Sequence, residues 1–497
     1  MGSFILAIDQ GTTGSTALIL EKSGHTVARA NVEFPQHYPQ PGWVEHDPEE
    51  IWDSVLKAIS QALASASITA EQIAAIGITN QRETTTVWDR ATGRAVHSSI
   101  VWQCRRTADR CQALRDAGHG PRVRELTGLV LDPYFSGTKI GWILDHVPGA
   151  RDRASKGELA FGTIDSLLCF KLTGGKAHVT DVSNASRTML LNLATLDWDD
   201  EMCGMLSVPR AMLPKVVGCA ERIGVTTGVP GLPDGIPICG IAGDQQAALF
   251  GQACMDVGDV KCTYGTGAFV LVNTGNRAVQ SRFGLLTTVG WRIGAEVVYA
   301  LEGSAFIAGA AVQWLRDGLG LIKKASEIEP LARKVDSSGG VMFVPALAGL
   351  GAPYWDAEAR GLMCGITRGT TSAHLARATL EGIAHEVSDL IGAMSDDLGY
   401  QVGRIRVDGG AAANDLLMQM QADLAGITVE RPAELETTAR GAAMLAAVGL
   451  GLYASGRQAA GMVQLDRTFA VQMAADQRGM NRKSWADAIQ RARLKPT

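Results

Sequence analysis

The sequence lacks most features that mark secreted proteins, membrane-spanning proteins or proteins stabilised by a structural metal ion. None of its nine cysteines forms a C-x-x-C pair, and its nine histidines show no metal-ligand spacing, so neither a disulfide framework nor a zinc site is expected. No run is long and apolar enough to cross a membrane, and the first residues have no basic region followed by an apolar signal core. These absences predict a protein of the reducing cytoplasm, with no membrane span.

An excess of basic residues is also missing. Lys and Arg number 46 against 51 Asp and Glu, and the formal net charge of -5 argues against nucleic acid as a partner. The 497 residues, 46% of them hydrophobic, are too many for one core. We therefore predict two large globular domains, residues 1–251 and 252–497, with the boundary in a short polar stretch that two glycines flank.

Two common nucleotide-binding motifs are absent as well. No G-x-x-x-x-G-K-[ST] occurs, so the chain has no P-loop. Residues 4–20 combine an apolar run, a polar Gly-rich turn at 9–16 and a second apolar run, which predicts a hairpin. Because that turn returns into a strand and not into a helix, it is not a Rossmann fingerprint.

The turn of this hairpin nevertheless has the composition of a phosphate-binding loop. Gly11 and Gly14 allow the backbone to approach a ligand closely, and Thr12 and Thr13 add hydroxyl donors. Asp9, at the end of the buried strand, can hold a hydrated magnesium ion. Taken alone, the stretch is explained equally well as an ordinary hairpin.

The same pattern returns in the second half of the chain. A turn at 264–267 lies between two predicted strands, and a third Gly-rich turn, 408–410, follows another strand. Both halves thus begin with a hairpin and continue with alternating strands and helices, which predicts an α/β fold with a structural pseudo-repeat. Phosphate loops in facing domains suggest a nucleotide between them, and the stretch from Asp408 to Asn414 could carry adenine.

The remaining elements follow from hydrophobic periodicity. We expect further strands at 25–34, 73–78, 236–241, 297–301, 404–407 and 427–430, and helices starting at Asp47 and at 304–315, 380–394, 414–424 and 438–448. The segment 158–171 is interpreted as a helix or a buried strand, and the tail after residue 455 as partly helical.

A second polar cluster follows the buried strand at 73–78, where open α/β sheets place ligands. A guanidinium and carboxylates can bind a small polyol through its hydroxyls, and aromatic faces can cover its carbons. The cluster comprises Arg82, Glu83, Trp102, Tyr134, Asp244 and Gln245. The alternatives are a surface ion pair for the adjacent charged residues, a helix N-cap for the aspartate and core packing for the two aromatics.

Long motifs in a fixed order give the chain its family resemblance. They are Asp-Gln-Gly-Thr-Thr at 9–13, Pro-Gly-Trp-Val-Glu-His-Asp-Pro at 41–48, Ile-Gly-Ile-Thr-Asn-Gln-Arg-Glu-Thr-Thr at 76–85, Val-Trp-Gln-Cys-Arg-Arg-Thr at 101–107, Asp-Pro-Tyr-Phe-Ser-Gly-Thr-Lys at 132–139, Gly-Ile-Ala-Gly-Asp-Gln-Gln-Ala-Ala-Leu-Phe-Gly at 240–251, Thr-Tyr-Gly-Thr-Gly at 263–267, Gly-Leu-Gly-Ala-Pro-Tyr-Trp-Asp at 349–356 and Arg-Val-Asp-Gly-Gly at 406–410. From about residue 4 to about residue 450 the chain resembles the FGGY family of carbohydrate kinases, most closely its glycerol-phosphorylating members.

This resemblance implies two actin-like (ribonuclease-H-like) domains that flank an ATP cleft. It implies a kinase reaction, ATP plus glycerol giving ADP and sn-glycerol 3-phosphate, which is the first step of glycerol catabolism, with Mg²⁺ as the metal. It further implies a cytoplasmic homo-oligomer, a dimer or a tetramer.

The matching motifs also imply roles for individual residues. For glycerol they are Arg82, Glu83, Trp102, Tyr134, Asp244, Gln245 and Phe269. For the nucleotide they are Thr12, Thr13, Gly14, Thr266, Gly309, Gln313, Gly410 and Asn414. Asp244 is the implied general base, since a hydroxyl must lose its proton as it attacks phosphorus, and Asp9 is the implied metal ligand.

Some positions depart from the family pattern. Gly14 and Thr16 stand where relatives often have Ser and Arg, so the phosphate turn has no cationic side chain of its own. The loop 226–236 has no basic residue, and no histidine lies between His178 and His374. We therefore expect neither the inhibition by fructose bisphosphate nor the activation by histidine phosphorylation that some relatives show.

Two other functions fit parts of the sequence. The first is an FGGY kinase that acts on a pentulose or another polyol, which substrate kinetics would distinguish. The second is an actin-fold ATPase that uses closure to bind a protein partner, as chaperone ATPases do. Such an ATPase needs no polyol-gripping cluster, and its ATP turnover would not depend on glycerol.

Overall fold

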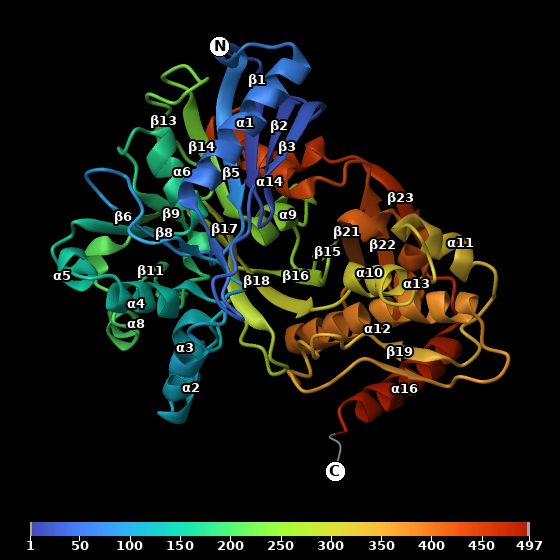
Figure 1. The fold of residues 1–497 in the computed structure, drawn as a ribbon. Coiled ribbons are helices and arrows are strands. Elements are labelled where there is room, and N and C mark those ends of the chain that lie inside the picture. The colour runs from blue at the N-terminus through green and yellow to red at the C-terminus, as the bar shows by residue number, and fades with distance from the viewer. Residues whose placement is uncertain (1, 495–497) are drawn as a thin grey trace.

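Two large β-sheets organise the chain, whose residues 2–494 are described by a computed structural model (Figure 1). The first sheet, in spatial order, consists of β13 (Gly224–Val225), β14 (Pro237–Gly243), β5 (Ile73–Asn80), β1 (Phe4–Gln10), β2 (Gly14–Glu21) and β3 (Thr26–Glu33). The second consists of β17 (Leu286–Ile293), β18 (Glu296–Ala305), β16 (Ala268–Gly275), β15 (Val260–Tyr264), β21 (Arg404–Asp408), β22 (Thr428–Pro432) and β23 (Leu465–Phe469).

Both sheets have the same internal plan, which confirms the predicted pseudo-repeat. In the first, β1, β2 and β3 form an antiparallel meander, and β5 and then β14 join it in parallel beside β1. In the second, β15, β16 and β18 pair antiparallel in the same spatial arrangement, with β17 added at the outer edge, and β21 and β22 follow in parallel beside β15. The carboxyl ends of β1, β5 and β14 therefore lie together, as do those of β15 and β21.

Helices and short strands complete the fold. The helices are α1 (Pro48–Ala66), α2 (Ala108–Asp116), α3 (Gly120–Thr127), α4 (Ser136–His146), α5 (Ala150–Ser155), α6 (Ile164–Leu172), α7 (Val182–Ala185), α8 (Asp200–Leu206), α9 (Asp244–Gly251), α10 (Gly309–Asp317), α11 (Ile328–Ala332), α12 (Ser372–Leu398), α13 (Asp415–Ala425), α14 (Thr437–Gly449), α15 (Gly456–Ala459) and α16 (Ala475–Ala492). The short strands are β4 (Glu45–His46), β6 (Thr86–Asp89), β7 (Ser99–Ile100), β8 (Leu159–Gly162), β9 (Val179–Asp181), β10 (Leu191–Asn192), β11 (Asp197–Trp198), β12 (Lys215–Val217), β19 (Met342–Val344) and β20 (Leu362–Cys364).

Helix α14 belongs to the second half by sequence, but it packs on the first sheet. Its alanines form one apolar cluster with side chains of β1, β2 and β5. The approach is close enough that a Cβ on Gly77 of β5 would lie 2.2 Å from the carbonyl oxygen of Ala442. Small residues on both elements therefore let helix and strand backbones touch, and the helix ties the two halves together.

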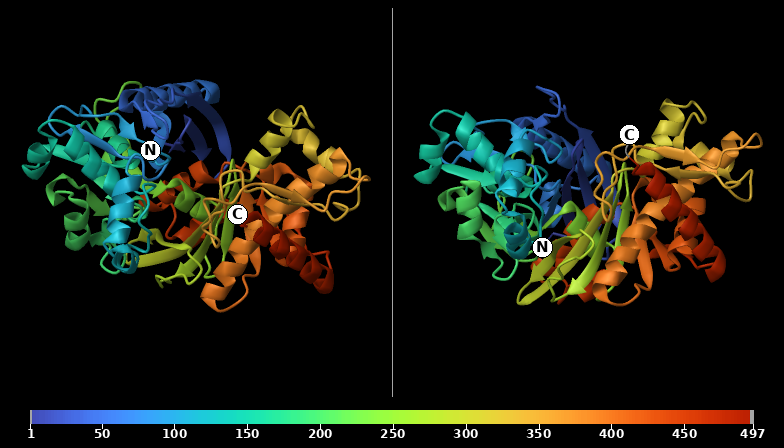
Figure 2. Two further views of the ribbon diagram at one scale, coloured as in Figure 1. Left: turned by 60° about the horizontal axis from the view of Figure 1, so that its bottom comes forward. Right: turned by 90° about the horizontal axis from the view of Figure 1, so that it is seen from below.

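The edge of the second sheet also packs on the first half. Side chains of β16, β17 and β18 share one core cluster with residues of α3, α4 and α9. The Tyr299 hydroxyl donates to the carbonyl oxygen of Leu193 at 2.7 Å. Figures 1 and 2 show β17 and β18 between the helices of the first half and α12.

One sequence-based assignment needs correction, one strand was missed, and one open alternative is resolved. The predicted helix at 304–315 begins only at Gly309, because Ser304 and Ala305 still pair with β16. Strand β17 was not predicted, since Gly290 interrupts its apolar pattern and forms a bulge there. The segment 158–171 contains both elements proposed for it, first β8 and then α6.

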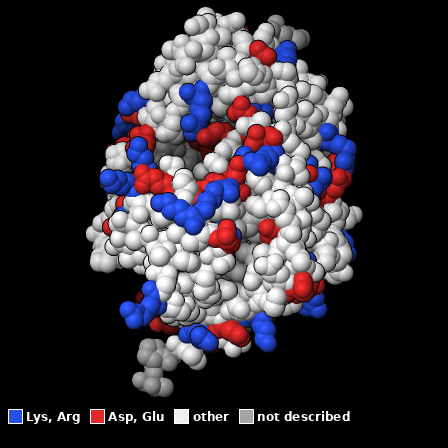
Figure 3. All heavy atoms as spheres, turned by 90° about the vertical axis from the view of Figure 1, so that its right-hand side faces the viewer, with Lys and Arg blue, Asp and Glu red and all other residues white. Residues whose placement is uncertain are grey.

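Two further predictions were that the chain has no membrane span and no disulfide framework. Among residues 2–494 no helix combines the length and the apolar character that a membrane crossing requires. All nine cysteines are free, and eight of them are buried. Figure 3 shows basic and acidic side chains interspersed over one face of the molecule, so this face presents no broad surface of a single sign.

Candidate active site

The polar cluster predicted at the end of β5 is buried, not a surface ion pair. Arg82 is 3% exposed and Glu83 is 1% exposed. Glu83 adopts a left-handed backbone conformation with φ of 61°, which is strained for a side chain of this size. Its carbonyl oxygen accepts hydrogen bonds from the Ser136 hydroxyl at 3.0 Å and from the Lys139 ammonium at 3.3 Å. Donors from α4 therefore hold this strained turn in place.

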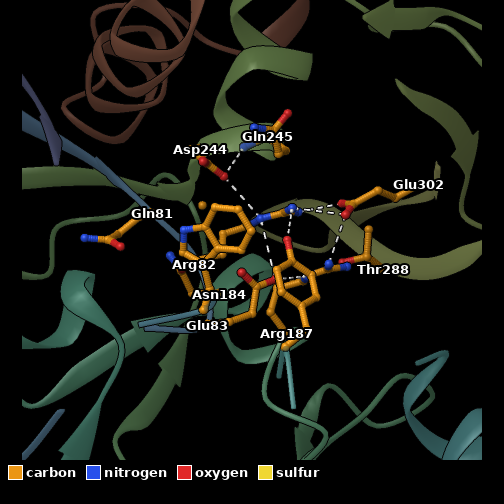
Figure 4. A network of polar contacts seen from close by, with 12 residues as sticks. Gln81, Arg82, Glu83, Asn184, Arg187, Asp244, Gln245, Thr288 and Glu302 are labelled. Atoms are coloured by element: carbon orange, nitrogen blue, oxygen red, sulfur yellow. Dashed lines mark hydrogen bonds and ion pairs between the residues drawn. The ribbon is translucent and has the colours of Figure 1, made fainter. Parts of the chain in front are cut away.

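The guanidinium of Arg82 is the centre of the cluster (Figure 4). Its Nε lies 3.1 Å from Oδ1 of Asp244 at the start of α9. Its Nη1 and Nη2 lie 2.5 Å and 3.0 Å from the two carboxylate oxygens of Glu302 on β18. The Nη2 group is also 3.4 Å from the Tyr134 hydroxyl. One arginine thus joins the first sheet, the second sheet and an aromatic side chain.

A second buried arginine completes a ring of charges. Arg187, which follows α7, donates from Nε to Glu83 at 2.6 Å and from Nη2 to Glu302 at 2.9 Å. Burial would raise the pKa of Glu302, but the charges of Arg187 and Arg82 and a hydrogen bond from Arg82 lower that pKa to about 2. For Glu83 burial dominates, and its pKa is raised despite the same two arginines. Glu302 is therefore firmly ionised.

Helix α9 carries the two other predicted polyol contacts. Its N-cap is Gly243, and Asp244 is the first helical residue, so the N-cap alternative for Asp244 is wrong. The carboxylate forms an ion pair with Arg82 and accepts a hydrogen bond from the Gln245 backbone N–H at 2.7 Å, and its side chain remains 30% exposed. The side-chain oxygen of Gln245 accepts a hydrogen bond from Lys261 on β15. Asp244 is thus held in orientation while part of it stays accessible.

The predicted aromatic contacts connect this cluster to the phosphate hairpin. The rings of Trp102 and Tyr134 meet edge to face, with centroids 5.6 Å apart. The Trp102 indole N–H donates to Oγ1 of Thr12 at 2.9 Å. Phe269 lies on β16, partly buried and opposite Ser304. Trp102 and Tyr134 are partly buried and pack against the large core cluster, so the core-packing alternative accounts for part of their placement.

The nucleotide residues predicted in the second half are brought together around one turn. The carbonyl oxygen of Thr266 accepts from the backbone N–H of Ala310 at 3.0 Å, and that of Gly265 accepts from Gly309 at 2.9 Å. The N-terminus of α10 is therefore tied to this turn, and Gln313 follows Gly309 on that helix and is exposed.

The third Gly-rich turn lies against the same place. Gly409 has φ of 84°, and a Cβ there would lie 2.5 Å from the carbonyl oxygen of Tyr264. Beyond Gly410, Asn414 caps α13, with its side-chain oxygen accepting from the Leu417 N–H at 2.9 Å. Asn414 thus has a structural role whether or not it contacts a nucleotide.

The first hairpin has little positive charge of its own. Thr13 is exposed at its tip, Gly14 begins β2, and the Thr16 hydroxyl is bound by the Asn31 amide at 2.9 Å. A basic side chain, Arg29, lies on the neighbouring strand β3 and forms a 2.8 Å ion pair with Glu436.

The surroundings of Asp9 fit a magnesium ion. Burial and the charges of Asp244 and Glu436 raise the pKa of Asp9 to about 8, and Arg29 offsets this only in part. Within residues 2–494 no three His, Cys, Asp or Glu side chains come together as a metal cage. Mg²⁺ usually needs only one or two carboxylates, with water and substrate phosphates as its other ligands. A crowded carboxylate that lacks a full cationic partner fits such an ion.

Sequence reasoning missed several residues of this site. They are Lys139, Arg187, Gln246, Lys261 and Glu302, all of them buried. A signal was available for the last two, because each charged residue interrupts an apolar stretch of its strand. Such residues are rare unless they are paired.

Comparison with known proteins gives consistent matches along the whole chain. The N-terminal and C-terminal domains of the FGGY family of carbohydrate kinases match residues 4–251 and 260–450. A glycerol kinase from Myxococcus xanthus is 57% identical over 98% of this chain and 99% of its own length. Glycerol kinase 2 from Thermotoga maritima is 55% identical over 98% of each chain.

Solved structures agree with these matches. A crystal structure of Plasmodium falciparum glycerol kinase with ADP has a TM-score of 0.94 at 34% identity and covers 99% of both chains. A ligand-bound xylulose kinase from Lactobacillus acidophilus has a TM-score of 0.86 at 23% identity, a likeness that concerns the fold alone.

Proposed function

This chain belongs to the FGGY family of carbohydrate kinases, and from this premise we propose that it transfers a phosphoryl group from ATP to glycerol. The products are ADP and sn-glycerol 3-phosphate. Identity of about 55% to glycerol kinases over the full length supports this function, as does the structural likeness to a glycerol kinase that holds ADP.

The observation that carries the proposal is the contact between Arg82 and Asp244, 3.1 Å apart at the carboxyl ends of β5 and β14. It places a fixed cationic donor beside a partly exposed carboxylate. Together with Glu83 and Gln245 they offer donors and acceptors for the hydroxyls of a small triol, while Trp102, Tyr134 and Phe269 cover its carbons. A protein-binding ATPase has no need of such a cluster.

The nucleotide is assigned to the three Gly-rich turns. Thr12, Thr13 and Gly14 of the first hairpin and Thr266 of the second contact the phosphates through hydroxyl and backbone N–H groups. The rest of the nucleotide lies along Gly309, Gln313, Gly410 and Asn414. Since α10 is hydrogen-bonded to the turn at 264–267 and Gly409 packs closely on Tyr264, they form a preorganised surface for it.

The chemistry follows from the position of Asp244. A neutral hydroxyl is a poor nucleophile, so the carboxylate of Asp244 takes its proton as the oxygen attacks the γ-phosphorus. Arg82 and the N–H of Gln245 hold that carboxylate in place. The hairpin N–H groups donate to the phosphate oxygens, where charge develops during transfer. A magnesium ion bound near Asp9 would neutralise charge on the transferring phosphates.

A coupled assay of ADP release tests the function directly. With Mg·ATP, we expect turnover that depends on glycerol, with glycerol preferred over pentuloses, hexoses and longer polyols in kcat/KM. A preferred sugar would replace glycerol as the substrate and keep the family. ATP turnover that is indifferent to every polyol would instead support the protein-binding ATPase.

The metal assignment has its own test. We expect chelation of Mg²⁺ to abolish turnover, and Asp9→Asn to raise the Mg²⁺ concentration needed for half-maximal activity by about tenfold or more, because a hydrogen bond or contact to a charged group contributes about 1.5–3 kcal/mol. Asp234→Asn, in the 226–236 loop, is the matched control and should leave the Mg²⁺ titration unchanged. An unaltered titration for Asp9→Asn would remove this residue from the metal site.

We also propose that the enzyme acts in the cytoplasm as a homo-oligomer. The free thiols support a reducing compartment. The domain boundary at residues 251 and 252, and the insensitivity to fructose bisphosphate and to histidine phosphorylation, stay predictions.

A further inference from the structure

Two charged residues lie in one row of the second sheet. Lys261 on β15 and Glu302 on β18 are both directly opposite Leu271 of the intervening strand β16. Side chains in register point to the same face of a sheet, so all three share one face. Leu271 belongs to the core cluster that contains residues of α3 and α9, which shows that this face meets the first half.

Charges at such positions are costly unless they are paired. Lys261 is fully buried and Glu302 is 3% exposed. Burial lowers the pKa of Lys261, although the charges of Asp408 and Asp244 oppose this shift. Removing an ionised group from water costs several kcal/mol, which good geometry and hydrogen bonds must offset. Apolar residues would build this interface more simply, so the two charges require another explanation.

Glu302 determines which edge of Arg82 is free for other partners. Its two oxygens bind Nη1 and Nη2 of Arg82, which is the bidentate arrangement that fixes the plane of a guanidinium. The edge formed by Nε and Nη2 then faces Asp244 and the Tyr134 hydroxyl. Both of these residues are assigned to the polyol site.

The same carboxylate orients Glu83 through Arg187. One Glu302 oxygen accepts from Arg187 Nη2 at 2.9 Å, and Arg187 Nε donates to Glu83 at 2.6 Å. Arg187 is fully buried, so its contacts to these two carboxylates can act only within the protein. Glu302 is therefore one bond from Arg82 and two bonds from Glu83.

Lys261 orients the side chain of Gln245, as Glu302 orients Arg82 and Glu83. Its ammonium donates to the side-chain oxygen of Gln245 and, at 3.0 Å, to the Thr263 hydroxyl. An ammonium has donors only, so it forces the amide oxygen of Gln245 toward itself. The amide nitrogen of Gln245 is then turned away from Lys261 and is available as a donor.

We propose that Glu302 and Lys261 are positioning residues of the polyol site, so that the second sheet sets the orientation of Arg82, Glu83 and Gln245 in the first half. Tight polyol binding then requires contact between the two halves. This inference rests on the proposed function, because it takes these three side chains to be polyol ligands.

The test measures KM for glycerol, KM for ATP and kcat separately. We expect Glu302→Gln to raise KM for glycerol between about 10-fold and 100-fold, the range of one hydrogen bond to a charged group. KM for ATP should change less than about twofold. Glu302→Asp keeps the charge and serves if the first variant folds poorly, and Lys261→Gln should shift KM for glycerol in the same direction. Glu201→Gln, at the exposed pair with Arg122, is the matched control and should change nothing.

A double-mutant cycle separates positioning from general stabilisation. Because Glu302 acts on Arg82 directly and on Glu83 through Arg187, the double variant Arg82→Gln/Glu302→Gln should raise KM for glycerol by less than the product of the two single fold-changes. Fold-changes that multiply would overturn the inference. So would variants that lose thermal stability or active fraction while KM for glycerol stays at the wild-type value, since a merely structural ion pair predicts that result. Failure of the proposed function is distinguishable, because the wild-type enzyme would then show no glycerol-dependent turnover.

Discussion

Asp244→Asn should lower kcat by roughly 10²–10⁴-fold, the usual contribution of a positioned general base. The amide is nearly isosteric, and its oxygen can still lie beside Arg82 Nε, so the arginine keeps a polar neighbour there. It cannot take the proton from a glycerol hydroxyl. Turnover should therefore fall while KM for glycerol changes much less. A coupled assay at saturating ATP measures both quantities.

The matched control for this variant is Asp47→Asn. Asp47 caps α1 with its carboxylate, which accepts from the Glu49 N–H at 2.8 Å, and asparagine caps helices about as well. Its kcat should equal that of the wild type. An Asp244→Asn enzyme that retained kcat within about threefold would exclude this residue as the base and leave the polyol site without a proton acceptor of known position.

Gly441→Ala should produce the largest loss of stability. Helix α14 crosses α9 so closely that a Cβ on Gly441 would lie 1.8 Å from the carbonyl oxygen of Ala247. Neither helix can retreat easily, because α14 also touches the backbone of β5 at Gly77. We expect a loss of about 3 kcal/mol in the free energy of unfolding, at the upper end for overpacking. Urea denaturation followed by circular dichroism measures it.

A second helical glycine gives the control. Gly392 lies in α12, and a Cβ there would meet no atom within 4 Å. Gly392→Ala should be neutral or should stabilise the protein by up to about 1 kcal/mol, since alanine favours the helix. Equal urea midpoints for the Gly441 variant and the wild type would mean that the two helices can separate without cost.

Much of the fold could be predicted from local patterns. The opening hairpin, its counterpart around Tyr264 and the strands after each follow from apolar runs that end in Gly-rich turns. The prediction was poorer where the pattern is weak. Helix α16 has only three buried residues, Trp485, Ala488 and Ile489, so its periodicity is faint. Strand β17 is broken by a bulge at Gly290.

The site could be predicted only in part, and for a different reason. Arg82 and Glu83 were identified because they follow a buried strand directly. Their partner Glu302 is 220 residues from Arg82 in the sequence. Nothing local in either segment indicates that pairing, which depends on how the second sheet packs on the first half. What the sequence does reveal is that a charge within an apolar stretch of a strand needs a partner.

The position of α14 has a consequence for biosynthesis. The face of the first sheet formed by Ile5, Ala7, Leu18 and Leu20 is covered by residues 437–449. A ribosome makes this helix more than 400 residues after β1. Until then the nascent first half carries a bare apolar face, which is a surface that chaperones bind. The chain must therefore be nearly complete before its first sheet can finish folding.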